Sequence, residues 1–175
     1  MDIWEANSAS EALTPHVCSV TGQTACNSTT TCGTGDANRY TGLCDKDGCD
    51  FNPYRWGNHS FYGPGMTVDT KSKFTVVTQF ITSDGTTSGT LTAIKRLYVQ
   101  NGKVIQQSNT NVAGITTTNQ ITDTFCNQQK KVTNGTNQFE ALGGLANMGK
   151  AMDKGMVLVL SIWGMYVPQL NSGMY

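Results

Sequence analysis

Charged residues are scarce in this sequence, and neither sign is in excess. Twelve Lys and Arg balance twelve Asp and Glu, and charged residues make up 14% of the 175 positions. Proteins that bind nucleic acids or anionic membranes usually carry a basic patch that meets the phosphates. We therefore expect neither a nucleic acid nor a membrane as partner. The abundant Thr, Ser, Asn, Gln and Gly favour an uncharged ligand rich in hydroxyl groups.

The six cysteines include no C-x-x-C pair, the spacing that zinc and thioredoxin-like sites use. Five of them lie within residues 18–49 and the sixth is Cys126. An even count crowded into an irregular segment is typical of disulfides, which persist in oxidising compartments. Sequons at Asn27, Asn58 and Asn134 are compatible with export. We expect disulfides, no metal or organic cofactor, and a secreted protein, extracellular or in a digestive vacuole.

Long apolar segments are also missing. The longest apolar run, residues 156–160, is too short to cross a bilayer, and the N-terminus lacks the succession of basic, apolar and small residues typical of a signal peptide. A disulfide-bearing chain without an export signal is expected to be either a mature protein or a piece of a longer one. Met1 is then not necessarily the initiator.

Apolar patterns predict a mostly β chain. The β-branched and aromatic run 74–81 predicts a buried strand. Residues 91–100 and 103–107 flank Asn101-Gly102, the dipeptide that favours a type I′ hairpin turn. The continuous apolar run 156–163 predicts a fully covered strand.

One short helix and long loops complete the prediction. Apolar residues at helical spacing over 138–154, followed by Gly155, predict the helix. Residues 17–65 are turn-rich and predict a loop region held by the cysteines, whereas the polar residues 108–137 are expected to form loops and short edge strands. With 175 residues and no internal repeat, we expect one domain, a β-sandwich. Patterning alone does not separate a jelly roll from other sandwiches.

Two carboxylates flank a tryptophan at the start of the chain, Asp2 and Glu5. Side chains alternate on a regular strand, so these two face the same way only if a bulge follows Ile3. Hydrolysis of a glycosidic bond requires a carboxylic acid and a carboxylate on either side of the anomeric carbon. Taken alone, the pair is more typical of two solvated carboxylates on an edge strand.

A series of motifs gives this pair a context. The run 1–7 resembles the catalytic strand of glycoside hydrolase family 7, in which Glu-x-Asp-x-x-Glu carries three acidic residues, and Asp2 and Glu5 match the second and third. The resemblance continues in order through residues 10–16, 38–40, 45–50, 52–55, 60–65 and 161–163. Several motifs in order are far more specific than a lone acidic pair.

The resemblance implies an incomplete concanavalin A-like jelly roll that hydrolyses β-1,4-glucosidic bonds of cellulose with retention, releasing cellobiose as cellobiohydrolases do. We expect a monomer that binds a β-1,4-glucan chain. Glu5 matches the general acid/base and Asp2 the carboxyl that supports the nucleophile. The nucleophile itself is expected directly before Met1, so that residues 1–175 would be the central part of a catalytic domain.

Three alternatives stay open. One is an endo-β-1,4-glucanase of the same family, and another is a non-catalytic glucan-binding sandwich, although a lectin has no need of an acidic triad. A disulfide-rich structural module would explain the cysteines, but not the acidic pair together with His16 and Arg39.

The resemblance also assigns residues around the acidic pair. His16 matches a histidine beside the acid/base, and a solvated histidine after a proline is its alternative. Arg39, Asp47 and Arg55 match residues on the product side of the cleft, where forked donors and carboxylates can hold sugar hydroxyls. A surface ion-pair cluster is their alternative. Tyr40 is expected to line the cleft as well.

Trp163 matches a tryptophan that stacks on a glucosyl ring, and core packing is its alternative. Beyond it the family continues with acidic or amide residues and a second tryptophan, whereas residues 164–170 of this chain read Gly-Met-Tyr-Val-Pro-Gln-Leu and contain no tryptophan. The resemblance pairs the six cysteines as Cys18 with Cys44, Cys26 with Cys32, and Cys49 with Cys126.

Overall fold

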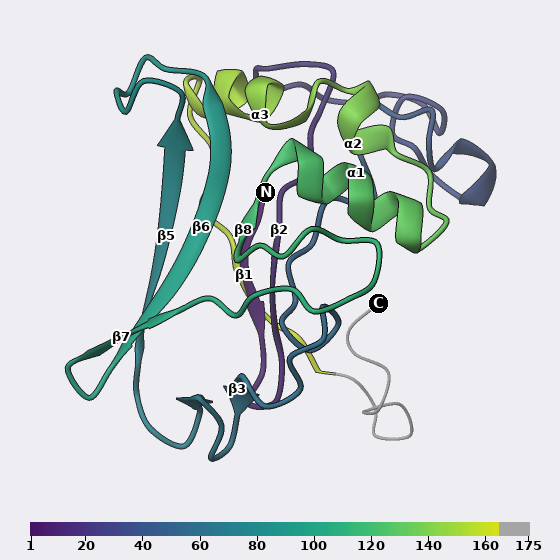
Figure 1. The fold of residues 1–175 in the computed structure, drawn as a ribbon. Coiled ribbons are helices and arrows are strands. Elements are labelled where there is room, and N and C mark those ends of the chain that lie inside the picture. The colour runs from purple at the N-terminus through teal and green to yellow at the C-terminus, as the bar shows by residue number, and fades with distance from the viewer. Residues whose placement is uncertain (165–175) are drawn as a thin grey trace.

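The larger of two main sheets is built on the long strand β6 (Leu91–Gln100) in the computed structural model, which describes residues 1–164 (Figure 1). Strand β5 (Thr75–Thr82) pairs with one edge of β6, and β7 (Lys103–Gln106) and β8 (Gln120–Ile121) pair with the other, all antiparallel. In the turn between β6 and β7, Asn101 and Gly102 have φ angles of 51° and 74°. A type I′ turn requires two such positive φ angles, so the predicted hairpin is confirmed.

The smaller sheet carries the acidic pair. Its central strand β1 (Asp2–Ala6) pairs antiparallel with β2 (Glu11–Thr14) and parallel with β9 (Leu160–Ile162). The turn between β1 and β2 is held by Asn7, whose Oδ1 accepts hydrogen bonds from the backbone N–H groups of Ala9 and Ser10. The register of β1 against β2 shifts between Asp2 and Glu5, so the predicted bulge is confirmed.

The two sheets pack through the inner face of β6. Ile94, Arg96 and Tyr98 point from this face and are at most 1% exposed. Ile94 joins the main apolar core with Leu13 of β2, and Tyr98 forms a second aromatic cluster beside Trp4 of β1. The mostly β sandwich predicted from the sequence is confirmed. Strands β3 (Tyr62–Gly63) and β4 (Val68–Asp69) form a separate short pair at one end.

The helices differ in part from the prediction. The expected helix over 138–154 is divided into α2 (Gln138–Ala141) and α3 (Gly144–Met152), because Gly143 between them adopts a left-handed conformation, φ 96°. Helix α1 (Asp123–Val132) lies where loops and short edge strands were expected, and that part of the prediction is wrong. Its N-cap is Thr122, whose side chain accepts a hydrogen bond from Phe125 N–H. Figure 1 shows the three helices together at one end of the fold.

Two strand predictions also need correction. Strand β5 exists as predicted, but it is an edge strand with partly exposed residues on both faces, and so it is not buried. The run 156–163 is not a fully covered strand: only β9 is extended within it, and Val157 and Ile162 are 84% and 93% exposed. Val157 precedes β9, and β9 itself lies at the edge of its sheet, where none of the described residues covers Ile162. The predicted departure at 164–170 lies almost wholly outside the described residues.

Residues 17–65 form the expected loop region, with only a 3-10 turn, η1 (Asp36–Asn38), and β3 as regular elements. The structure contains the disulfides Cys18–Cys44, Cys26–Cys32 and Cys49–Cys126, as the resemblance implied. The third bridge joins the loop region to α1. Within residues 1–164, no helix combines the length and the apolar character needed to cross a membrane.

The disulfides are expected to contribute unequally to stability. Cys49–Cys126 closes a separation of 77 residues and Cys26–Cys32 one of 6. In the chain-entropy model, replacing the first pair by alanines lowers the free energy of unfolding by about 4 kcal/mol and replacing the second by about 2 kcal/mol. Denaturant unfolding of the two double variants, followed by tryptophan fluorescence, measures the difference. Equal losses would contradict the assignment of the longer bridge as the main covalent constraint.

Candidate active site

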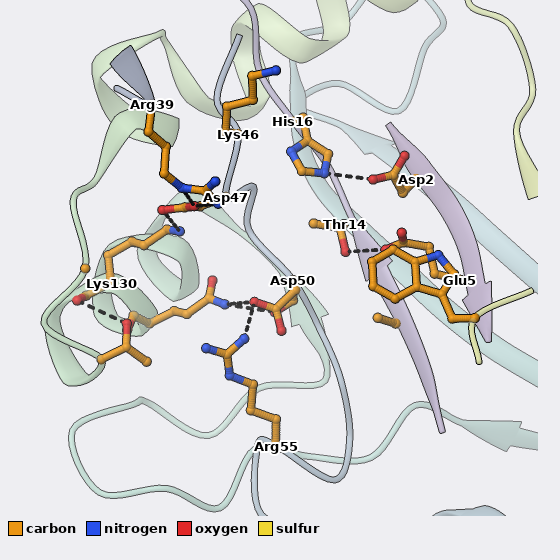
Figure 2. A pocket seen from close by; sticks show the side chains of 15 residues that line it. Asp2, Glu5, Thr14, His16, Arg39, Lys46, Asp47, Asp50, Arg55 and Lys130 are labelled. Carbon is orange, nitrogen blue, oxygen red and sulfur yellow. Dashed lines mark hydrogen bonds and ion pairs between the residues drawn. The ribbon is translucent and has the colours of Figure 1, made fainter. Parts of the chain in front are cut away.

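A cleft of about 560 Å³ opens beside the bulged strand. Figure 2 shows Asp2, Glu5, Thr14 and His16 on one wall, with Arg39, Asp47 and Lys130 on the opposite wall. The bulge places two β1 residues opposite one β2 residue, and both carboxyl groups consequently line the same cavity. We call these the acidic wall and the cationic wall.

Glu5 is the more buried carboxyl of the acidic wall, with 7% of the residue exposed. Desolvation raises the pKa of Glu5, and repulsion by Asp2 raises it further. The hydroxyl of Thr14 donates a hydrogen bond to Glu5 Oε2 over 3.1 Å and acts in the opposite direction, but the net shift is upward. Glu5 therefore retains a proton at a pH where an exposed glutamate has lost it, as a general acid must.

Asp2 is held by His16. The ring of His16 lies between two oxygens, with Nδ1 2.8 Å from the carbonyl oxygen of Asp45 and Nε2 2.8 Å from Asp2 Oδ2. A carbonyl oxygen only accepts, so Nδ1 carries a hydrogen. The contact of Nε2 with Asp2 Oδ2 fixes the orientation of the Asp2 carboxyl.

The approach of the loop to these side chains depends on Gly48. Its φ is +67°, and a Cβ at this position would lie 2.5 Å from Thr14 Cγ2 and 2.9 Å from His16 Cε1. Any larger residue would displace the two side chains that contact Glu5 and Asp2.

The cationic wall is organised around Asp47. Arg39 donates to Asp47 through Nε, at 2.7 Å, and through Nη2; Tyr40 donates its hydroxyl at 3.0 Å, and Lys130 Nζ lies 4.0 Å away. Desolvation acts to raise the pKa of Asp47, but these donors outweigh it and the pKa lies below the usual value. Arg39 and Asp47 line the cleft. Tyr40 is not among the described residues that line it and contacts the site through its hydrogen bond to Asp47.

Between the two walls, Asp50 holds Arg55. Arg55 Nη1 donates to Asp50 Oδ1 over 3.0 Å, and the side-chain amide of Gln129 donates to the same oxygen (Figure 2). The guanidinium of Arg55 also lies over the Trp56 ring, 5.2 Å from its centroid. Asp50 and Arg55 therefore form a preorganised hydrogen-bonding group within the cleft.

Trp163 closes the cleft from the end of β9. It lines the cavity and is 37% exposed, so it does not serve core packing alone. Its backbone N–H donates to the carbonyl of Ala6, its indole N–H donates to Ser161 Oγ, and its carbonyl accepts from Asn7 Nδ2. These contacts fix the ring next to the acidic strand.

Of the residues named from the sequence, seven line the cleft and Tyr40 lies behind it. Reasoning from the sequence gave no role to the other lining residues, among them Thr14, Lys46, Asp50, Gln129 and Lys130. The last two are on α1, which was not predicted. The Thr122 cap, with Asp123 in the first turn and Lys130 and Lys131 in the last, is the signal that could have located this helix. Among the described residues, no group of three His, Cys, Asp or Glu could hold a metal ion.

Known proteins resemble this chain in sequence and in fold. A sequence model of glycosyl hydrolase family 7 matches residues 1–171. A family 7 cellobiohydrolase from Daphnia pulex is 46% identical, with a TM-score of 0.83, over 87% of this chain and 35% of that one. The native endocellulase EGI of Humicola insolens is 39% identical (TM-score 0.72, the same coverages), and a cellobiohydrolase of Melanocarpus albomyces complexed with cellotetraose is 35% identical (TM-score 0.76, 88% of this chain and 34% of that one).

This chain thus spans about a third of the length of the solved proteins that it matches. The match covers the bulged acidic strand, the disulfide-held loops and Trp163. The chain belongs to glycosyl hydrolase family 7.

Proposed function

We propose that residues 1–175 are part of the catalytic domain of a secreted cellulase that hydrolyses β-1,4-glucosidic bonds with retention of configuration. The observation that carries this proposal is the placement of Asp2 and a buried Glu5 of raised pKa on one wall of a cleft whose other wall offers Arg39 and Asp47. Similar proteins are named cellobiohydrolases and endocellulases, and one was solved with cellotetraose. A neutral polymer fits a chain of zero net charge, and three disulfides fit an oxidising, extracellular compartment.

In this proposal Glu5 is the acid/base. Its raised pKa lets it donate a proton to the leaving oxygen, and as a carboxylate it then takes a proton from the water that completes the reaction. Asp2, oriented by His16, supports the nucleophile, which we propose is a glutamate directly before Met1 in the complete protein. Retention requires the two carboxyl groups roughly 5–5.5 Å apart on opposite sides of the anomeric carbon.

The remaining cleft residues bind sugar. Arg39 is held by its hydrogen bonds to Asp47, and Arg55 by its hydrogen bond to Asp50. Sugar hydroxyls therefore meet donors and acceptors that are already ordered. Trp163 offers an aromatic face for stacking. The proposed chemistry requires neither a metal nor an organic cofactor.

The roles of the two glutamates are separated by the leaving group. In the complete domain, Glu5→Gln is expected to release a burst of phenol from an aryl β-cellobioside with a good leaving group, because such a group needs little protonation. Turnover after the burst is expected to be slow, because the variant lacks the carboxylate that takes a proton from the attacking water. Replacing the glutamate before Met1 by glutamine is expected to abolish the burst, since no covalent intermediate forms. Stopped-flow measurement of phenol release distinguishes the two.

The control is the 175-residue chain without that glutamate, for which no turnover is expected. Turnover of the chain at a rate comparable with the complete domain would refute the assignment of the nucleophile. Binding of cellotetraose without any hydrolysis by the complete domain would favour the non-catalytic glucan-binding alternative.

Two substitutions should move the pH profile in opposite directions. The protonated form of Glu5 is required, so the alkaline limb of kcat/KM follows the pKa of Glu5 in the free enzyme. Thr14→Val removes a hydrogen bond that favours the carboxylate, and the limb moves to higher pH. Asp2→Asn removes the repulsion, and the limb moves to lower pH. Thr92→Val, on the exposed side of β6, is the control and leaves the limb in place. A shift of the same sign in both site variants would contradict the causes given for the raised pKa of Glu5.

We further propose that the enzyme is of the cellobiohydrolase type. The segment held by Cys18–Cys44 and Cys26–Cys32 carries Arg39 at the cleft, and it resembles a loop that family endoglucanases shorten. A loop that covers the glucan favours processive release, so crystalline cellulose should yield mostly cellobiose. Product chromatography tests this. Rapid loss of viscosity of a soluble cellulose derivative, with little cellobiose, would assign the protein to the endoglucanases instead.

A further inference from the structure

The bulge in β1 has a buried cation directly behind it. Asp2 pairs with Thr14 and Glu5 with Ala12, so Ile3 and Trp4 together stand opposite Leu13 alone. A strand can lose such a bulge by a one-residue slip, which turns every side chain beyond it to the other face. Slippage here would remove either Asp2 or Glu5 from the cleft.

One guanidinium contacts both bulged residues. Arg96, which projects from the inner face of β6, donates through Nη2 to the carbonyl oxygen of Ile3. Its Cζ lies 5.1 Å from the centroid of the Trp4 ring, in cation–π contact. The carbonyl and the ring belong to the two β1 residues that stand opposite Leu13 alone, and so Arg96 contacts the bulge at both of its residues.

Arg96 is itself held in a buried network. Its Nη1 lies 3.1 Å from Glu11 Oε2, and the side chains of the two residues are 1% and 0% exposed. Glu11 Oε1 also accepts hydrogen bonds from the hydroxyl of Tyr98, at 2.7 Å, and from Gln107 Nε2, at 3.2 Å. Burial, followed by the charge of Glu11, raises the pKa of Tyr98, which keeps its hydroxyl protonated as a donor. The guanidinium therefore has little freedom to turn away from Ile3.

We propose that Arg96 is a positioning residue for catalysis: by binding the bulged Ile3 carbonyl and the Trp4 ring at once, it keeps Glu5 and Asp2 on the cleft face of β1. The inference rests on the proposed function for its kinetic consequence, whereas the register itself is a structural property. Only the fork of an arginine reaches Glu11 and Ile3 together, since a lysine presents a single point charge.

The test uses the complete domain and compares two aryl β-cellobiosides, one with a poor and one with a good leaving group. Arg96→Lys keeps the charge beside Glu11 but loses the fork. The ratio of kcat/KM, poor over good leaving group, is expected to fall about tenfold or more, because only the poor leaving group requires the proton of a well-placed Glu5. A purely structural role would reduce the fraction of active enzyme, which lowers both rates equally and leaves this ratio unchanged. An unchanged ratio would overturn the proposal.

Two further variants make the result specific. Thr78→Val removes another acceptor of Arg96 Nη2, 3.3 Å away on β5, and the ratio is expected to stay at the wild-type value. If Arg96→Lys does not fold, Arg96→Met with Glu11→Gln removes both buried charges together, which proteins often tolerate, and the same fall in the ratio is expected.

Failure of the proposed function gives a different result. If the unmodified domain hydrolyses neither substrate, that function is wrong, and a crystal structure of the folded Arg96 variant decides the inference. Retention of the pairs Asp2 with Thr14 and Glu5 with Ala12 would overturn it, and loss of this register would support it.

Discussion

The bulge at Ile3 and Trp4 is the constraint on which the site depends. Side chains of a strand alternate between faces, so two carboxyl groups three residues apart share a cavity only when one extra residue is inserted between them. The insertion interrupts pairing with β2 at the point where the site is built. Its position is secured from behind by a buried ion pair, Arg96 with Glu11. Such pairs add little net stability, yet breaking one costs about 3–5 kcal/mol because an unpaired charge stays buried. A register of β1 that separates the guanidinium from the Ile3 carbonyl and the Trp4 ring is therefore unfavourable. The ion pair thus constrains the geometry of β1 more than it stabilises the fold.

The environments of the two walls explain why the carboxyl groups of Glu5 and Asp47 have pKa values shifted in opposite directions. Glu5 is desolvated and repelled by Asp2, with a threonine hydroxyl as the opposing hydrogen-bond donor, and its pKa rises. Asp47 is also partly desolvated, but a guanidinium, a phenol and an ammonium group surround it, and its pKa falls. One wall can thus exchange a proton, while the other keeps a permanent carboxylate that orders Arg39. Burial acts to raise the pKa of both carboxyl groups, and it prevails at Glu5, whereas the cationic and hydroxyl partners of Asp47 outweigh it there.

What the sequence could predict depended on whether the determinant was local. Asn101-Gly102 sets the hairpin through its own φ preferences, and the spacing of Asp2 and Glu5 requires a bulge if both act together. The disulfides and most cleft residues followed from the resemblance to the family. Helix α1 was missed because its polar surface resembles a loop in composition, and with it Gln129 and Lys130 were missed as cleft residues. The run 156–163 was assigned to a covered strand because an apolar pattern reports which side chains a chain can bury, whereas exposure depends on what lies over them.

The connection between α1 and the cleft shows why a long covalent bridge matters in this fold. Cys49 precedes Asp50, and Cys126 lies one turn before Gln129 and Lys130 on α1. The disulfide therefore joins the two segments whose side chains meet at Asp50 and approach Asp47. Loop residues rich in glycine lose much backbone entropy on ordering, and the loop region contains little regular hydrogen bonding to offset it. A bridge across 77 residues removes much of that entropy from the unfolded chain beforehand. The cationic wall can then be made from loops and still face the acidic wall in a fixed geometry, which is what a cleft needs if bound sugar is to meet ordered donors and acceptors.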